Sequence, residues 1–382
     1  MDQLNSASSG GDLAATVGGD AAGWDAAGWD GTRPQAFQMP PAAVPVIDLS
    51  APDEAATVAA LGRACRDSGF FIAAGHGVPQ PVVDAMFDQM RRLFALPLED
   101  KMKMLQDENN RGYTPMAEET LDPERQTRGD TKEGFYFGRE VPAGSPEADL
   151  PLHGPNVWPP PALLPGFRPA AEAYFREAST LGHRLLRLLA LSLGLEPAHF
   201  DRYFDPPMAF LRPLRYGPEA SSPGEGVFGA GAHTDYGMLT ILATDGSPGL
   251  QVRLGGAWVE VPPAPGCFVC NLGDMLERWT NGLYRSTLHR VVSTSGKERF
   301  SLPFFFEPNF SAVVEALPCC VTPDRPARHP PTTAGAHLLE KYAATHAGYQ
   351  QGAEKSGAGA GGGRENGGDQ SDGGGGGAEE GR

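Results

Sequence analysis

Three stretches of the chain decide its fold: GAHTDYGMLTIL (Gly231–Leu242), VCNLGDMLERWTNGLYRSTLHRVV (Val269–Val292) and RFSLPFFFEPN (Arg299–Asn309). Each contains short runs of β-branched, aromatic or leucine side chains bounded by turn-forming residues, a pattern typical of β-strands. Each also carries histidine, aspartate or arginine within or beside such a run. We therefore expect a β-rich core that presents polar side chains at a few shared points.

The first two stretches contain a possible metal site. Side chains two positions apart on a strand point to the same side, so His233 and Asp235 in the pattern H-x-D can reach one point. His289 lies in another β-type run, STLHRVV. Two imidazoles and one carboxylate form a facial triad that leaves open positions on the metal, as a non-haem Fe(II) oxygenase requires. H-x-D alone is a common tripeptide, so the prediction depends on the neighbouring motifs.

The third stretch adds a carboxylate-binding pattern, R-x-S, in which Arg299 and Ser301 share one face of a strand. A guanidinium fork and a hydroxyl group together suit a carboxylate. A surface ion pair is the plain alternative for Arg299. However, this residue opens the apolar run FSLPFFF, where a buried guanidinium needs a partner. The pattern therefore predicts an anion site next to the metal site.

Together these motifs closely resemble the catalytic core of the isopenicillin N synthase-like branch of the 2-oxoglutarate/Fe(II)-dependent dioxygenases. Two more motifs, VPVIDLS (Val44–Ser50) and CRDSGFFIAAGHGVP (Cys65–Pro79), resemble the N-terminal region of that family. The resemblance extends from about Val44 to about His346. It implies an α+β fold with a mainly β core, a double-stranded β-helix (jelly roll) with flanking helices.

The resemblance also implies cofactors and their binding residues. Fe(II) is the implied metal, with 2-oxoglutarate as cosubstrate and O₂ as oxidant. The implied iron ligands are His233, Asp235 and His289. The far carboxylate of oxoglutarate would bind Arg299 and Ser301, and Tyr216 in LRPLRYGP matches a family tyrosine that helps to hold the cosubstrate. The implied reaction converts oxoglutarate to succinate and CO₂ while a small organic metabolite is hydroxylated, desaturated or cyclised.

Two segments before the core, RGYTP (Arg111–Pro115) and KEGFYFG (Lys132–Gly138), border the substrate pocket in this family. Binding residues concentrate on such segments, although plain packing is the alternative for each side chain. A residue before a glycine turn between two expected strands is a further candidate. The candidates for substrate contact are Arg111, Tyr113, Lys132, Phe135, Tyr136 and Asn271.

Helices are expected mostly before the strands. The first begins after Ser50, which we expect to be its cap, and ends near Gly69. Apolar spacing predicts further helices at about 81–94 and 168–193, and a closing helix at about 333–346. Residues 107–161 are expected to be rich in loops. The expected core strands are Ala209–Tyr216, Leu239–Thr244, Leu250–Leu254, Ala257–Val261, Cys267–Leu272, Thr287–Val292 and Phe300–Phe306.

Four regions are expected along the chain. They are a low-complexity extension (1–43), an N-terminal dioxygenase region (44–165), a jelly-roll core with its preceding and closing helices (166–348), and a Gly-rich tail (349–382). We expect both ends to be disordered, because such compositions cannot bury enough apolar surface to offset the entropy of ordering.

Charge and cysteine content narrow the function further. The net charge of −16 argues against a broad nucleic-acid or anionic membrane surface. No apolar run approaches the ~18 residues of a membrane helix, and no targeting signal is evident. The C-x-x-C of Cys267 and Cys270 falls on an expected strand, where the two thiols point apart and do not suit zinc. We therefore expect a cytoplasmic enzyme acting on a small molecule, with no nucleic-acid, membrane or protein partner inferred.

Two alternatives remain open at this point. An oxidase of the isopenicillin N synthase type would use O₂ without oxoglutarate, and R-x-S would then hold its own substrate. A catalytically inactive binding protein of the same fold would predict a broken triad or a missing arginine, and neither is seen. The substrate itself is not specified, since neither the fold nor the cofactor chemistry determines it.

Overall fold

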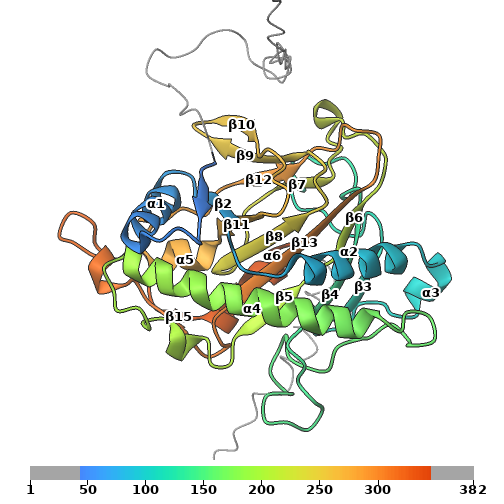
Figure 1. Ribbon diagram of the computed structural model, residues 1–382, viewed down its shortest axis with the longest axis horizontal. Coiled ribbons are helices and arrows are strands. Elements are labelled where there is room, and N and C mark those ends of the chain that lie inside the picture. The colour runs from blue at the N-terminus through green and yellow to red at the C-terminus, as the bar shows by residue number, and fades with distance from the viewer. Residues whose placement is uncertain (1–43, 346–382) are drawn as a thin grey trace, which may run out of the picture. The chain divides into compact units, whose positions relative to one another are not determined.

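The computed structural model, which describes residues 44–345, has two main β-sheets with helices covering the outer face of the larger one (Figure 1). The low-complexity ends predicted from the sequence lie outside the described residues. A cavity lies between the two sheets and is lined by side chains from both. The predicted jelly-roll core with flanking helices is confirmed.

The larger sheet has nine strands in the order β1-β2-β11-β8-β13-β5-β4-β3, and β6 pairs with both β13 and β4. Its strands are β1 (Val46–Asp48), β2 (Phe70–Ala74), β3 (Gly112–Thr114), β4 (Lys132–Gly138), β5 (Met208–Leu211), β6 (Leu214–Tyr216), β8 (Leu239–Thr244), β11 (Phe268–Leu272) and β13 (Arg299–Glu307). Strand β13 lies at the centre, and most of its side chains are buried.

The smaller sheet has four strands in the order β10-β9-β12-β7. Its strands are β7 (Ala230–His233), β9 (Leu250–Leu254), β10 (Ala257–Glu260) and β12 (His289–Val291), and a separate pair joins β14 (Val313–Val314) to β15 (Thr332–Thr333). In the pairing of β12 with β7, His289 lies directly opposite His233. The register of this sheet therefore brings the two predicted histidine ligands together.

Three helices pack together on the larger sheet: the long helix α4 crosses in front of the strands, with α1 against one end of it and α2 towards the other (Figure 1). The helices are α1 (Glu54–Asp67), α2 (Gln80–Phe94), α3 (Leu98–Met102), α4 (Phe167–Ser192), α5 (Asp274–Trp279) and α6 (Ala334–Thr345). Helix α4, whose buried residues include several leucines, packs against β8 and β13. The cap of α1 is Asp53, which accepts a hydrogen bond from the Ala56 amide, and not Ser50 as predicted.

One further prediction about the strands needs correction. The single run predicted for 209–216 is two strands, β5 and β6, separated at Pro213, whose missing N–H cannot join a ladder. Residues 107–161 are rich in loops, as predicted, and they also contribute β3 and β4 to the large sheet. The N-terminal region therefore supplies part of the wall around the site.

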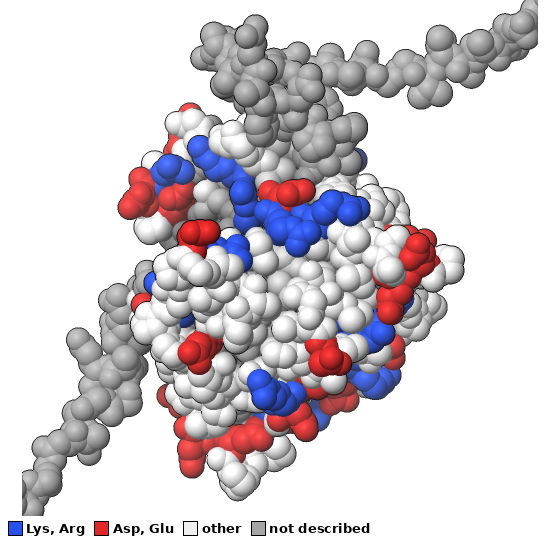
Figure 2. Space-filling model, turned by 90° about the vertical axis from the view of Figure 1, so that its left-hand side faces the viewer, with Lys and Arg blue, Asp and Glu red and all other residues white. Residues whose placement is uncertain are grey.

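The charges on the surface are unevenly distributed. Figure 2 shows Lys and Arg side chains gathered in a band across one face, although the whole chain carries a net charge of −16. Among residues 44–345, no helix is both long enough and apolar enough to cross a membrane.

Candidate active site

His233, Asp235 and His289 bring their donor atoms together at one point. Their ligand atoms all lie within 4.8 Å of one another. The Asp235 Oδ1 atom is 3.9 Å from His233 Nε2 and 3.7 Å from His289 Nε2. These separations suit three donors around one divalent ion, and two nitrogens with one oxygen suit Fe(II).

Backbone carbonyl groups fix the orientation of both imidazoles. The Nδ1 atom of His233 lies 2.8 Å from the Gly231 carbonyl, and Nδ1 of His289 lies 3.0 Å from the Thr287 carbonyl. A proton on each Nδ1 leaves each Nε2 lone pair directed at the shared point. Burial lowers the pKa of His233, helped by the neighbouring His289, so this imidazole is neutral at pH 7.

Asp235 lies just beyond the strand, because β7 ends at His233. The prediction that both residues lie on one strand is therefore wrong in detail, although their side chains still converge. Thr240 Oγ1 and Asn271 Nδ2 donate hydrogen bonds to Asp235 Oδ2 at 2.5 and 2.6 Å, which leaves Oδ1 for a metal. Burial opposes ionisation, but the two imidazoles and these hydrogen bonds outweigh it and lower the pKa of Asp235.

Arg299 is buried, and its Nε and Nη1 atoms have no hydrogen-bond partner within the described part of the chain. Its guanidinium carbon lies 4.8 Å from the centre of the Tyr216 ring, which faces it across β6 and β13. Ser301 lies on the same face of β13 and is also buried. Buried donors without partners are costly, so this arrangement suits an anion that completes the site.

Two neighbouring cavities share His233 and Asp235 in their linings. One is lined by these two residues and His289 together with Tyr216, Arg299 and Ser301. The other extends from His233 and Asp235 towards α6. We refer to them as the β cavity and the α6 cavity.

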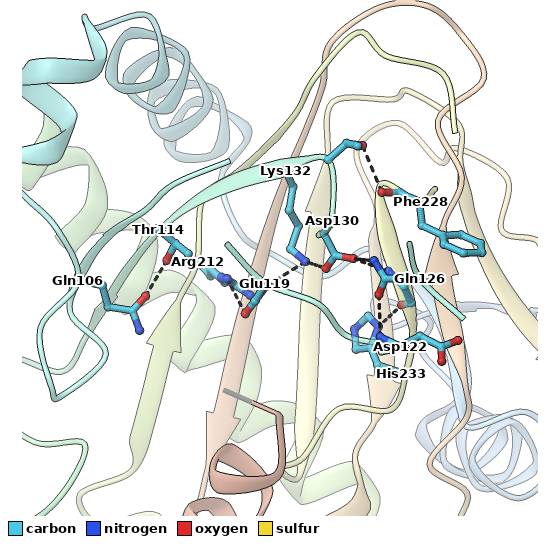
Figure 3. A network of polar contacts seen from close by, with 12 residues as sticks. Gln106, Thr114, Glu119, Asp122, Gln126, Asp130, Lys132, Arg212, Phe228 and His233 are labelled. Atoms are coloured by element: carbon cyan, nitrogen blue, oxygen red, sulfur yellow. Dashed lines mark hydrogen bonds and ion pairs between the residues drawn. The ribbon is translucent and has the colours of Figure 1, made fainter. Parts of the chain in front are cut away.

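A network of ionic groups joins the N-terminal region to the metal site, as Figure 3 shows. Lys132 pairs with Asp130 and, at 2.9 Å, with Glu119. Glu119 also accepts a hydrogen bond from Arg212 at 2.9 Å. The Oδ1 atom of Asp130 accepts a hydrogen bond from the Gly231 amide at 2.8 Å, and the Gly231 carbonyl in turn orients His233. The network therefore supports the strand that presents the first histidine.

The six predicted substrate contacts divide into two groups. Lys132 and Asn271 line the β cavity, and Tyr136 lines the α6 cavity. The other three line neither cavity. Arg111 donates to the Asn109 and Leu152 carbonyls, Tyr113 donates to Glu133, and Phe135 packs on Phe167. Alternation along β4 explains the division, because Lys132 and Tyr136 share one face and Phe135 lies on the other.

The sequence prediction missed several cavity residues. Glu119 and Arg212 face the α6 cavity, and so does Glu307 at the end of β13. Burial raises the pKa of Glu307 to about 8, against a hydrogen bond from the Met238 amide. The period of two along β13 could have revealed Glu307, because it shares its face with Arg299 and Ser301.

Comparison with known families agrees with this geometry. The family model described as "non-haem dioxygenase in morphine synthesis N-terminal" matches residues 44–161, and that of the 2OG-Fe(II) oxygenase superfamily matches residues 209–308. The chain belongs to the 2-oxoglutarate/Fe(II)-dependent oxygenases. Members of this superfamily use Fe(II), 2-oxoglutarate and O₂, and this protein is a non-haem dioxygenase of that kind, acting on a small metabolite.

Individual oxygenases similar to the chain come from different organisms. The azadirone synthase of Melia azedarach is 35% identical over 78% of this chain and 91% of its own length. The homoarginine-6-hydroxylase of Arabidopsis thaliana is 37% identical over 72% of this chain and 88% of its own. Among solved structures, a full-length Neurospora crassa protein in complex with alpha-KG and thymine superposes with a TM-score of 0.71, at 28% identity, over 79% of this chain and 96% of that one.

Proposed function

We propose that His233, Asp235 and His289 hold the Fe(II) of this dioxygenase, and that Arg299, Ser301 and Tyr216 hold 2-oxoglutarate. The observation that carries the proposal is the convergence of three metal-binding atoms beside a buried guanidinium with partnerless donors. Iron bound there would activate O₂ for oxidation of a substrate C–H bond. The residues themselves supply position, charge and exclusion of water.

The two cavities have different proposed occupants. The β cavity contains Arg299 and is the proposed site of oxoglutarate. The far carboxylate of oxoglutarate would accept hydrogen bonds from the Nε and Nη1 atoms of Arg299, which have no other partner among the described residues. The α6 cavity reaches the triad from the other side and is the proposed substrate site, with Tyr136 and the Arg212–Glu119 pair on its walls. Lys132 is proposed to act through the ionic network, and Asn271 to orient Asp235.

The proposed substrate is a small organic metabolite. The lining of the α6 cavity, which is largely apolar and aromatic with a few polar groups, supports this class. The solved Neurospora relative carries thymine, and the Arabidopsis relative is named for homoarginine, both small molecules. A cytoplasmic location is also proposed, and the five free thiols fit a reducing compartment.

The test measures succinate formed from oxoglutarate by the full-length protein reconstituted with Fe(II). We expect turnover that requires both iron and oxoglutarate, and loss of iron binding in His233→Ala and His289→Ala while circular dichroism stays native. Cys319→Ser, an exposed position distant in sequence from the triad, is the control and should keep full iron content. Normal iron content and turnover in a histidine variant would refute the proposed ligands.

A further inference from the structure

Glu307 is a buried acid at the substrate end of the site. On β13 the inward-facing positions run from Arg299 through Ser301 and Phe305 to Glu307. At ~3.3 Å per residue, the two charged ends lie about 26 Å apart along the strand. The proposed oxoglutarate anchor thus stands at one end, and a carboxyl group stands at the other, beside the α6 cavity.

The carboxyl group of Glu307 has unused hydrogen-bond acceptor positions. The Met238 amide donates to Oε2 at 2.5 Å, and within residues 44–345 no Lys, Arg or His forms an ion pair with it. A carboxylate offers about four acceptor positions, so one bond leaves most of them unused. Gly237 makes room for this group, because a Cβ at that position would overlap the Glu307 carboxyl atoms.

Charge balance around the cavities singles out Glu307. The ionic network contains two acids, Glu119 and Asp130, and two bases, Lys132 and Arg212, so its charges cancel. If the proposed function holds, Fe(II), Asp235, doubly charged oxoglutarate and Arg299 also sum to zero. Glu307 belongs to neither balanced set, and because burial raises its pKa to about 8 the carboxyl group is largely neutral at pH 7 until a cation in the cavity stabilises the carboxylate.

The walls near Glu307 are aromatic, and an aromatic wall favours cations because the ring faces are electron-rich. The side chains of Tyr136, Phe210, Tyr236, Phe305 and Tyr342 line the same cavity as Glu307. Tyr342 stands edge-on to Tyr236, with ring centres 5.6 Å apart. An acid within aromatic walls is the arrangement that binds amines and guanidines.

We propose that Glu307 is a specificity residue that binds a cationic nitrogen of the prime substrate, so that the substrate is an amine or a guanidine. This inference rests on the proposed function, since it takes the α6 cavity as the substrate site. A role confined to holding the Met238 amide would use one acceptor position of the carboxyl group and leave the others unused beside the cavity.

The test compares pairs of probes that differ only in charge: benzylamine with benzyl alcohol, tryptamine with tryptophol, and benzylguanidine with benzylurea. Binding to the protein loaded with Mn(II) and oxoglutarate is measured by thermal shift and calorimetry. A charge-assisted hydrogen bond corresponds to about 10-fold or more in affinity. We expect each cationic probe to bind at least that much more tightly than its neutral partner.

Variants then assign the preference to Glu307. Glu307→Gln keeps an acceptor for the Met238 amide and should abolish the preference, whereas the exposed Glu124→Gln should keep it. If no cationic probe binds the wild-type protein more tightly than its partner, the inference is wrong, whether or not Glu307→Gln folds. A preference that persists in folded Glu307→Gln also refutes it. Iron-dependent succinate formation is followed in parallel, and its absence would instead refute the proposed function.

Discussion

Arg299 is the residue on which binding of the cosubstrate should depend most directly. Its guanidinium is buried and two of its nitrogens lack partners, so a bound carboxylate would be largely desolvated. Truncating one partner of such a charge pair costs roughly 2–5 kcal/mol, which is about 30-fold or more in affinity. We therefore expect Arg299→Ala to raise the oxoglutarate concentration for half-maximal succinate release at least that much, with Arg299→Lys between.

The companion variant is Ser301→Ala, which removes one hydroxyl and should cost about 1 kcal/mol. Iron content should stay normal in all three variants, since neither residue belongs to the triad. A different outcome would reassign the site. If Arg299→Ala needed the same oxoglutarate concentration as the wild-type protein but lost affinity for the prime substrate, Arg299 and Ser301 would bind the substrate instead.

Asn271 should influence iron binding without touching the metal. Its amide donates to Asp235 Oδ2 at 2.6 Å and so fixes which oxygen faces the histidines. Loss of a partner that orients a ligand typically costs about 10- to 100-fold in metal affinity. We expect that loss in Asn271→Ala, measured by competition with a chelator. The variant Asn271→Asp would place a second carboxylate beside Asp235 and would also remove the hydrogen bond from the amide. Unchanged metal affinity in both variants would contradict the role of Asn271 in orienting Asp235.

At the residue scale, what the sequence could predict follows from local periodicity. Arg299 and Ser301 are two apart on one strand, and the same count reaches Glu307, so that acid was within reach of the sequence. The partnership of Glu119 with Arg212 was not, because the two positions are far apart in sequence and meet only through the sheet. Long-range pairing of this kind carries no local signal.

At the scale of elements, β4 and the segment before it connect the N-terminal region to the metal site. Asp130 is almost fully buried, bonds the Gly231 amide of β7 and pairs with Lys132. Breaking a buried ion pair by removing one partner costs about 3–5 kcal/mol. We expect Asp130→Ala to lower the free energy of unfolding by that order and to weaken iron binding, because β7 loses an anchor.

The matched control is Glu219→Ala, which breaks an exposed pair with Arg128. Exposed pairs contribute about 0–1 kcal/mol, so its denaturant midpoint should hardly change. Equal effects of the two substitutions would show that burial of the Asp130 pair does not matter. The sequence offered little guidance here, since the region reads as loop and β4 joins the sheet by pairing with the distant strands β5 and β6.

At the scale of the whole molecule, helix α6 sets the boundary of the part needed for catalysis. Its residues Leu338 and Tyr342 line the α6 cavity, and His337 lies 2.8 Å from the Tyr236 carbonyl. The β cavity contains no residue of α6. Binding of oxoglutarate and binding of substrate should therefore respond differently to changes at this end of the chain.

Two shortened chains separate these effects. The described strands, both cavities and both family matches lie within 44–345, so a chain of residues 44–351 should keep the melting temperature, iron content and turnover of the full protein. A chain ending at Thr333 lacks α6 and should lose substrate-stimulated succinate release, because two side chains of the substrate cavity are gone. Since the iron and oxoglutarate residues remain, it should still bind both, as measured by metal content and calorimetry at low temperature.

Full substrate stimulation without α6 would place the substrate elsewhere. A marked fall in the melting temperature of the 44–351 chain would show that a terminal segment packs on the domain.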